Sequence, residues 1–413
     1  MRKQIAFVGA ACTLGLAFGG AAMAQPAATA PATSPAPSAP VVPAVTIGLP
    51  AGAKDVSDLL TPLLEKHKVP ALAAVVFEGD RIVMGGVAGL RLATRPEPAT
   101  LNDLWHLGSD TKAMTATLCA LLVERGQMSW SDTLASRFPD EAPAMHEKMR
   151  AVTLEQLLHN RGSVPADLRR DGLWSKLWAH TGTTTEGRLL LLRTVAAWEP
   201  GAAPGEKFEY SNGGFAIAGL MAERATGRSW EDLMQKELFA PLGISTAGFG
   251  APGEKDRADQ PRGHRPGSKP VEPGPGADNP ASIGPAGTVH MSITDWAKFC
   301  SAHLRGDGRN PSRAPVLLKP ETWDRLHAPW QGEAKGYAMG WGTGTRPWAK
   351  GSREGDTGAV LTHAGSNTMW MAVVWLAPER NLGVLVCCNQ GEGGAKATDE
   401  AVATLIRAFD AKP

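Results

Sequence analysis

The sequence predicts an α/β fold in which both ends of the chain build an antiparallel sheet flanked by helices, with an all-α lobe inserted between them. Short apolar runs separated by turn residues lie near both ends, within residues 71–87 and 359–388. Helical periodicity dominates the stretch between them, from about residue 109 to 330. Because strands joined by tight turns pair antiparallel, one sheet formed by both ends is the simplest architecture that these runs allow.

The N-terminal part of this fold is expected to contain one helix and two strands. Four leucines recur on one helical face within residues 56–67, which predicts an amphipathic helix. The apolar runs 71–77 and 81–87 predict strands, and Glu78-Gly79-Asp80 between them predicts a tight turn.

Helices and then further strands are expected in the rest of the chain. The predicted helices cover residues 109–124, 153–158, 185–198, 213–226, 230–239, 293–304 and 320–327. The runs 359–364, 368–376 and 382–388 predict an antiparallel meander, and residues 399–408 predict a closing helix. Residues 250–288 are rich in Gly and Pro and poor in apolar residues, so they are either a long loop or lid beside a functional feature or a disordered insert.

Composition excludes several classes of protein. The chain has 413 residues, of which 43% are hydrophobic and 20% charged, and this balance excludes a wholly disordered chain, a coiled coil and a polytopic membrane protein. Lys and Arg total 42 against 41 Asp and Glu, a formal net charge of +1. A nearly neutral chain has no electrostatic signature of binding to nucleic acid or to anionic membranes.

The N-terminus predicts export to the periplasm or secretion. A positive start at Arg2 and Lys3 is followed by an apolar run, and Ala22-Met23-Ala24 has the small-x-small pattern of a signal peptidase site, so cleavage is expected after Ala24. Residues 25–51 are rich in Pro and Ala and predict a linker, which is either a tether or an inert spacer.

The folded part is expected to be a single domain over residues 52–413. Its α/β lobe is predicted to comprise residues 52–108 and 331–413, and its all-α lobe residues 109–330. Four cysteines follow the expected cleavage site, and they form no C-x-x-C motif, so the sequence assigns no disulfide and supports no redox or zinc motif. The adjacent Cys387 and Cys388 should point to opposite faces of a strand.

Ser109-Asp110-Thr111-Lys112 is the first motif with chemical meaning. Residues three apart share a helix face, so the Ser109 hydroxyl and the Lys112 amine can meet. The positive end of the helix favours a developing oxyanion and, with burial, lowers the pKa of the lysine from its ordinary value of about 10.4. A neutral Lys112 would accept the Ser109 proton and make the serine a nucleophile. The structural alternative is a capping serine beside a surface lysine.

Two further motifs lie far along the chain. Tyr210-Ser211-Asn212 precedes a predicted helix; the phenol can share the movement of protons, and the amide can bind a substrate or the lysine. The alternative is a buried tyrosine before a helix cap. His363-Ala364-Gly365-Ser366 ends a predicted strand, where the glycine permits close approach of a ligand and the Ser366 N–H can join that of Ser109 as an oxyanion hole. Its alternative is a simple strand end with a bulge.

Together these motifs resemble those of the serine β-lactamase and penicillin-binding-protein superfamily. The resemblance is strongest to the branch that contains class C β-lactamases, D-alanyl-D-alanine carboxypeptidases and related esterases, which carries S-x-x-K, then Y-x-N, then K-T-G or H-x-G. It covers most of residues 56–410 and implies a β-lactamase/transpeptidase-like fold.

The resemblance also implies an activity. Ser109 would be acylated, Lys112 and Tyr210 would move protons, and water would then hydrolyse the acyl-enzyme. The substrate would be a small molecule or a peptide with an amide, ester or β-lactam bond. No metal or organic cofactor is implied.

Substrate binding is implied at a second set of positions. Asn212 would orient the substrate, while His363, Gly365 and Ser366 would line the strand side of the cleft. The backbone amides of Ser109 and Ser366 would form the oxyanion hole.

Three features depart from the pattern of the superfamily. His363 replaces the lysine of K-T-G, as in the peptidase and esterase members. Ala364 replaces a threonine whose hydroxyl helps to hold a substrate carboxylate in the relatives; losing such a bond costs about 1.5–3 kcal/mol, or about ten- to a hundredfold in binding. This argues against an efficient β-lactamase unless Arg353 or Ser366 compensates. Residues 157–163 also differ from the usual T-H-T-S-G, so the local turn is expected to differ.

Other chemistries have less support in the sequence. No G-x-S-x-G elbow and no H-x-H or H-E-x-x-H spacing occurs, which disfavours an α/β-hydrolase and a metallohydrolase. Trp105, Trp341 and Trp370 are either cleft walls or core residues. An exported serine hydrolase is therefore the leading hypothesis, without nucleic acid or stable membrane insertion after signal cleavage. A catalytically silent binding or scaffold protein is the alternative, and protein partners and oligomeric state are left open.

Overall fold

The computed structural model describes residues 48–331, 333 and 335–411. The predicted signal peptide and nearly all of the predicted linker lie outside the described residues. Among those residues, no helix combines the length and apolar character needed to cross a membrane.

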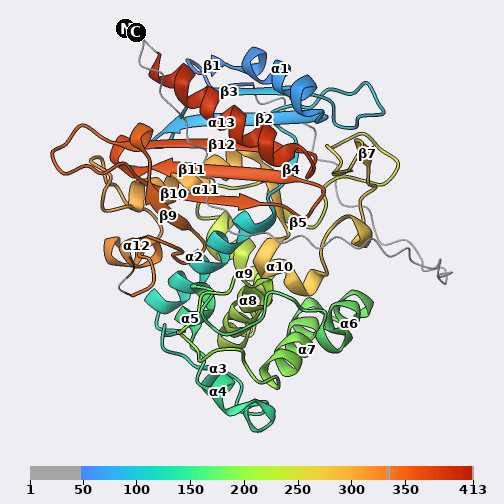
Figure 1. The fold of residues 1–413 in the computed structure, drawn as a ribbon, viewed down its shortest axis with the longest axis vertical. Coiled ribbons are helices and arrows are strands. Elements are labelled where there is room, and N and C mark those ends of the chain that lie inside the picture. Colours follow the sequence, from blue (N-terminus) through green and yellow to red (C-terminus); the bar gives the residue numbers. More distant parts are fainter. Residues whose placement is uncertain (1–47, 332, 334, 412–413) are drawn as a thin grey trace. The chain divides into compact units, whose positions relative to one another are not determined.

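A seven-stranded sheet forms the centre of the α/β lobe, in the order β1-β3-β2-β12-β11-β10-β9 (Figure 1). Its strands are β1 (Lys54–Asp55), β2 (Ala71–Glu78), β3 (Arg81–Gly89), β9 (Gly342–Thr345), β10 (Ala359–Gly365), β11 (Met371–Ala377) and β12 (Leu382–Cys388). β2 pairs antiparallel with β12 from the other end of the chain, with Val75 opposite Leu385. The predicted α/β class and the joining of both chain ends in one sheet are therefore confirmed.

The predicted C-terminal meander is confirmed as well. β10, β11 and β12 pair antiparallel in sequence order. The second strand begins at Met371 and not at residue 368, because Thr368 has a positive φ of 76° inside the turn that follows β10. Such a conformation cannot continue a strand.

Each face of the sheet is covered by different helices. The helices α1 (Ser57–His67) and α13 (Gly394–Asp410) pack on one face, and α11 (Ile293–Gly306) packs on the other (Figure 1). Cys387 belongs to the core beneath α11, while Cys388 belongs to the core beneath α1 and α13. The two thiols therefore point to opposite faces, as the alternation of a strand requires. All four cysteines of the described residues are buried and free.

The helical part is assembled around α2 (Thr111–Glu124). Its residues 111–122 are all buried, which explains why this segment is apolar on every side. The other helices of this part are α3 (Leu134–Arg137), α4 (Glu147–Arg150), α5 (Leu154–Leu158), α6 (Leu173–Ala179), α7 (Thr184–Ala196), α8 (Asn212–Thr226), α9 (Trp230–Leu233) and α12 (Pro320–His327). The helix predicted over 230–239 is α9 followed by a π-helical segment, Met234–Phe239.

The stretch predicted as all-α contains more than helices. Two of its short strands, β5 (Gly248–Phe249) and β8 (Val289–Ser292), form a small sheet with β4 (Leu104–His106). Moreover, α11 lies on the central sheet, so this helix belongs structurally with the α/β lobe. The difference from the expectation arises because lobe membership depends on packing across the chain and not on local periodicity.

Residues 250–288 have defined structure. They contain β6 (His264–Arg265), β7 (Lys269–Pro270), several 3₁₀ turns and the short helix α10 (Gly284–Gly287). Arg262 and His264 in this segment are buried. Of the two sequence alternatives, the structure thus favours an ordered loop over a disordered insert.

Candidate active site

Ser109 lies in a 3₁₀ turn, Gly108–Asp110, that leads directly into α2. This turn packs against β10 and β11 of the sheet. Gly108 has a φ of +51°, and a Cβ atom there would stand 2.4 Å from the backbone nitrogen of Ser366. Only glycine accommodates both the left-handed backbone and this close approach. The turn thus brings Ser109 against the end of β10.

The Lys112 amine is fully buried and contacts three oxygen atoms. Its Nζ lies 3.0 Å from Ser109 Oγ, 2.8 Å from Asn212 Oδ1 and 2.8 Å from the carbonyl oxygen of Ala286 in α10. A neutral amine has two hydrogens and one lone pair. The two carbonyl-type oxygens can each accept one hydrogen, which leaves the lone pair to accept the Ser109 hydroxyl hydrogen.

The surroundings of Lys112 favour this neutral form. Burial lowers the pKa of Lys112 well below its ordinary value, and the nearby Asp110 carboxylate opposes that change only in part. The distances agree with the sequence analysis. The Ser109 and Lys112 side chains are in contact one helical turn apart, and Asn212 contacts the lysine.

Tyr210 forms another wall around the same amine. The Lys112 Nζ atom lies 4.7 Å from the centre of the Tyr210 ring. Burial raises the pKa of Tyr210 above its ordinary value, although a hydrogen bond with Ser109 opposes the rise. The phenol therefore keeps its proton at neutral pH.

The turn at residues 157–163 supports the Tyr210 segment. Asn160 has a positive φ of 57°, a conformation that Asn adopts more readily than most residues. Its side-chain oxygen accepts a hydrogen bond from the Ser211 N–H at 3.0 Å, and its backbone oxygen accepts one from the Glu209 N–H at 2.8 Å. Ser211 in turn caps α8, accepting from the Gly214 N–H at 3.2 Å. Sequence reasoning noted the departure of this turn but missed this role of Asn160.

The strand side of the site is the end of β10. Pairing of β10 with β9 stops at Thr362, opposite Gly342, whereas pairing with β11 continues to Gly365. The backbone beyond Thr362 is thus an edge on the β9 side. His363 is buried, and its Nε2 lies 3.3 Å from the Tyr337 hydroxyl. The side chain of Ala364 is exposed on the opposite face of the strand.

The two backbone segments that carry the predicted oxyanion hole are in close contact. A Cβ atom on Gly365 would stand 1.9 Å from the Leu107 carbonyl oxygen and 2.8 Å from the Ser109 nitrogen. Ser366 follows directly, and its hydroxyl donates to the Trp370 carbonyl oxygen at 2.5 Å. Ser109 and Ser366 are therefore brought together as the motif pattern predicts.

A buried carboxylate from the 250–288 segment joins these two segments. Asp278 Oδ2 lies 2.7 Å from His106 Nε2, and His106 Nδ1 accepts the Gly108 N–H at 3.1 Å. The other carboxylate oxygen accepts from Asn367 Nδ2 at 3.2 Å. Because Gly108 precedes the nucleophile and Asn367 follows Ser366, one acidic side chain holds both sides of the site. Sequence analysis did not find His106, Asp278 or Asn367, since no motif links them.

The structure decides between the two roles that the sequence left open for three tryptophans, and it places Arg353 away from Ala364. Trp105, Trp341 and Trp370 are at most 1% exposed, so they are core residues. The Arg353 guanidinium contacts Asp356 and the Arg309 carbonyl oxygen in the region that leads into the opposite end of β10 from His363. Arg353 therefore cannot replace the missing hydroxyl at Ala364.

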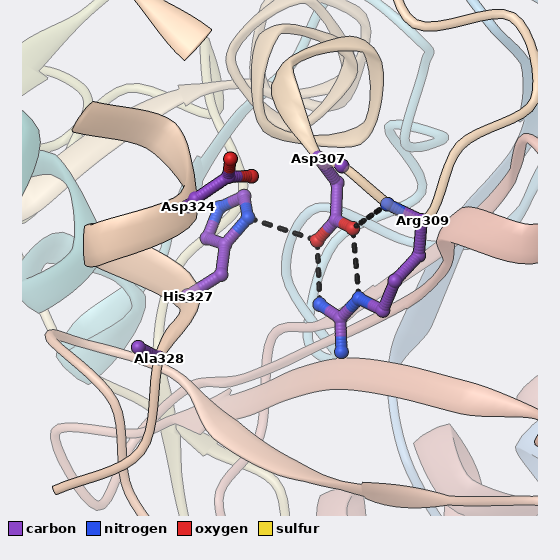
Figure 2. A pocket seen from close by; sticks show the side chains of 6 residues that line it. Asp307, Arg309, Asp324, His327 and Ala328 are labelled. Atoms are coloured by element: carbon purple, nitrogen blue, oxygen red, sulfur yellow. Dashed lines mark hydrogen bonds and ion pairs between the residues drawn. The ribbon is translucent and has the colours of Figure 1, made fainter. Parts of the chain in front are cut away.

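A separate pocket lies between the segment that follows α11 and the C-terminal end of α12. It is lined by Asp307, Gly308, Arg309, Asp324, His327 and Ala328, and Figure 2 shows the Asp307 carboxylate between Arg309 and His327. In the described part of the chain, no group of three or more His, Cys, Asp or Glu side chains is arranged to hold a metal ion. The pocket shares none of its lining residues with the predicted motifs.

A two-part fold with a serine and a buried lysine at the junction of helix and sheet defines a class: the serine β-lactamases and penicillin-binding proteins. The model of the Beta-lactamase family matches residues 56–408. The chain therefore belongs to the Beta-lactamase family.

Individual relatives are more distant. Penicillin-binding protein 4 of Amycolatopsis lactamdurans is 29% identical over 290 residues, which cover 68% of this chain and 72% of the relative. A beta-lactamase of Escherichia coli strain K12 is 26% identical over 248 residues, covering 60% of this chain and 59% of the relative. This chain thus spans about three-fifths of the second relative, so neither activity transfers directly.

Solved structures agree on the fold. The octameric penicillin-binding protein homologue from Pyrococcus abyssi has a TM-score of 0.65 at 22% identity, covering 84% of this chain and 75% of that one. A beta-lactamase from Sulfitobacter sp. EE-36 has a TM-score of 0.64 at 20% identity, covering 86% of this chain and 97% of that one. At these identities the likeness concerns the fold alone.

Proposed function

We propose that this protein is a serine hydrolase that forms an acyl-enzyme on Ser109 and acts on an ester, amide or β-lactam carbonyl. The observation that carries the proposal is the contact set of Lys112. Two carbonyl-type oxygens accept its hydrogens while Ser109 Oγ lies 3.0 Å from its nitrogen. A buried neutral amine in hydrogen-bond reach of a hydroxyl is the arrangement that general-base activation of a nucleophile requires.

The reaction follows from this geometry. Lys112 accepts the Ser109 proton as the serine oxygen attacks the carbonyl carbon, and the amides of Ser109 and Ser366 stabilise the oxyanion. Collapse of the tetrahedral intermediate breaks the bond to the leaving group, which takes a proton from the Lys112 ammonium or through Tyr210. Water then adds to the acyl carbonyl, loses a proton to the same base, and releases the acid and free Ser109.

The choice of substrate follows from the strand side of the site. Ala364 contributes no hydroxyl, and Arg353 is remote from His363. Esters without a free carboxyl group on this side are therefore favoured over β-lactams and D-amino-acid peptides, because both of these carry a carboxylate that the missing hydroxyl would help to hold. The N-terminal 24 residues further support export to the periplasm or secretion, which fractionation of expressing cells would test.

A substrate panel tests the proposal. The mature protein is incubated with p-nitrophenyl butyrate, a D-Ala-D-Ala peptide, nitrocefin and a fluorescent penicillin, and turnover and intact mass are measured. We expect turnover of at least one substrate and an adduct that is absent in Ser109→Ala.

Two results would contradict the assignment. One is the absence of both turnover and adduct with every substrate. The other is full activity in Ser109→Ala. A stable partner complex that survives this substitution without turnover would instead support the catalytically silent alternative.

A further inference from the structure

The residue directly after the nucleophile has an unusual environment. Asp110 is 2% exposed, and among the described residues neither of its carboxylate oxygens has a hydrogen-bond partner. Its Oδ1 lies 3.6 Å from His363 Nδ1, which also has no hydrogen-bond partner in that set. Its Oδ2 would be 2.8 Å from a Cβ atom on Gly365. A buried carboxyl without hydrogen bonds is costly, so a functional reason is expected for it.

His363 is oriented toward this carboxyl by its other nitrogen. The Tyr337 hydroxyl lies 3.3 Å from His363 Nε2, and as a donor it leaves that nitrogen as the acceptor. The ring hydrogen of a neutral His363 is then on Nδ1, the nitrogen that faces Asp110. A short movement would close the 3.6 Å gap into a hydrogen bond, as often happens to catalytic contacts when substrate binds.

Asp110 is also coupled to the lysine. Burial raises the pKa of Asp110 to about 6, and the nearby His363 and Lys112 side chains oppose this rise only in part. Reciprocally, a negative Asp110 favours the charged form of Lys112. The remaining titratable groups that face Asp110 are Tyr210, Tyr337, Cys300 and Cys387. Burial is the main cause that raises their pKa values, and the negative charge of Asp110 adds to it.

We propose that Asp110 is a positioning residue for the proposed acyl transfer: it holds His363 through Nδ1, and its charge sets how readily Lys112 becomes neutral and activates Ser109. The inference rests on the proposed function for its catalytic meaning. Asp110 itself contacts neither the substrate nor the Ser109 oxygen. It acts through the two groups on either side of it, one on β10 and one on α2.

The first test is the pH dependence of Asp110→Asn, which keeps the shape of the side chain and removes its charge. Because the neutral amide no longer favours the Lys112 ammonium, the acid limb of kcat/KM should move to lower pH by about one unit. The plateau of kcat should fall, because the neutral amide oxygen is a weaker acceptor for His363 Nδ1–H than the carboxylate. Asp58→Asn, an exposed position on α1, is the matched control and should change neither quantity. A uniform loss of activity with an unmoved limb would overturn the inference.

The second test does not need turnover. The titration of Lys112 in the wild-type protein is followed by NMR of ¹³Cε-labelled lysine, with Lys112→Arg used to assign the resonance. We expect a second inflection near pH 6, which reports protonation of Asp110. A single inflection in the wild-type protein would refute the coupling. An inactive wild-type protein that still shows both inflections would reject the proposed function and retain the coupled pair.

Discussion

At the scale of single residues, the site depends on a glycine, because there is no room for a side chain where β10 meets the turn that carries Ser109. The nucleophile turn and β10 approach so closely that no Cβ atom fits between them at Gly365, where the nearest backbone oxygen would be 1.9 Å away. The glycine of the H-x-G pattern is therefore required by packing against the Leu107 carbonyl and Asp110. The motif pattern alone does not explain why this position is glycine, whereas the packing does.

Replacement of this glycine should be severe. In Gly365→Ala the new methyl group forces β10 away from Ser109, so we expect a loss of stability of about 1–3 kcal/mol or more and loss of acylation. Urea denaturation and labelling by a fluorescent penicillin or a p-nitrophenyl ester measure the two effects. Gly344→Ala on the neighbouring strand β9 is the control, because nothing lies within 4 Å of its Cβ position. Equal behaviour of the two variants would contradict the packing argument.

At the scale of elements, the site joins three parts of the chain. The turn Gly108–Asp110 and the α2 helix that follows it contribute Ser109 and Lys112, the start of α8 contributes Asn212, and β10 contributes His363. The ordered segment 250–288 holds these parts in register through Asp278, which bonds His106 on one side and Asn367 on the other. The segment is thus a support for the site as well as a connection.

Loss of the Asp278 charge should affect rate more than binding. In Asp278→Asn the new NH₂ group faces a donor in either orientation, His106 Nε2–H or Asn367 Nδ2–H. The hydrogen bond lost in this way costs about 1–3 kcal/mol of stability. We expect the Gly108 and Asn367 segments to shift, so kcat should fall with little change in KM.

The matched control is Asp256→Asn in the same segment. Asp256 is exposed, so the same chemical change there should leave both constants unaltered. Steady-state kinetics on one ester substrate measures kcat and KM for both variants and for the wild-type protein. A rise in KM at unchanged kcat would assign Asp278 to substrate binding instead.

At the scale of the whole molecule, buried polar clusters connect the helices that surround the sheet. Asp307, at 1% exposed, accepts hydrogen bonds from the Arg309 guanidinium and lies 2.9 Å from His327 Nδ1 (Figure 2). His327 Nε2 is 2.9 Å from His303 Nδ1, and His303 Nε2 is 3.1 Å from the Thr117 hydroxyl on α2. This series of contacts links the end of α11, through α12, to α2, the helix that carries Lys112.

The cluster predicts a pH-dependent part of stability. Burial alone would raise the pKa of Asp307, but the bonds to Arg309 and His327 outweigh it and lower the pKa below its ordinary value. A lowered folded-state pKa means that the stabilisation is complete above the unfolded value of about 3.9 and is lost as the pH falls below it. Asp307→Asn should therefore cost about 3–5 kcal/mol at pH 7, and less at pH 3.

Urea denaturation of both proteins at pH 7, 5 and 3 measures this difference. Asp324→Asn in the same pocket is the control, because this carboxylate is half exposed and contacts Arg313 at the surface. Its effect should stay below about 1 kcal/mol. A difference between wild type and Asp307→Asn that does not shrink toward pH 3 would refute the linkage.

Much of this organisation was predictable from the sequence. Local periodicity predicted the strands and most helices, because alternation and helical spacing are properties of neighbours in the chain. The S-x-x-K spacing predicted the contact of Ser109 with Lys112 for the same reason, since both lie on one helical turn. The motif order also predicted the family, which the match over residues 56–408 confirms.

Tertiary structure alone decided the rest. That α11 covers the sheet, that Asn160 supports Ser211, that Asp278 joins two distant segments and that Asp110 is buried without a hydrogen bond all depend on contacts between residues far apart in the chain. Such contacts arise from the packing of whole elements, and their energy is not encoded in any local pattern. The sequence by itself determined which chemical groups the site contains, while the fold decided their burial and hence which of them carry protons.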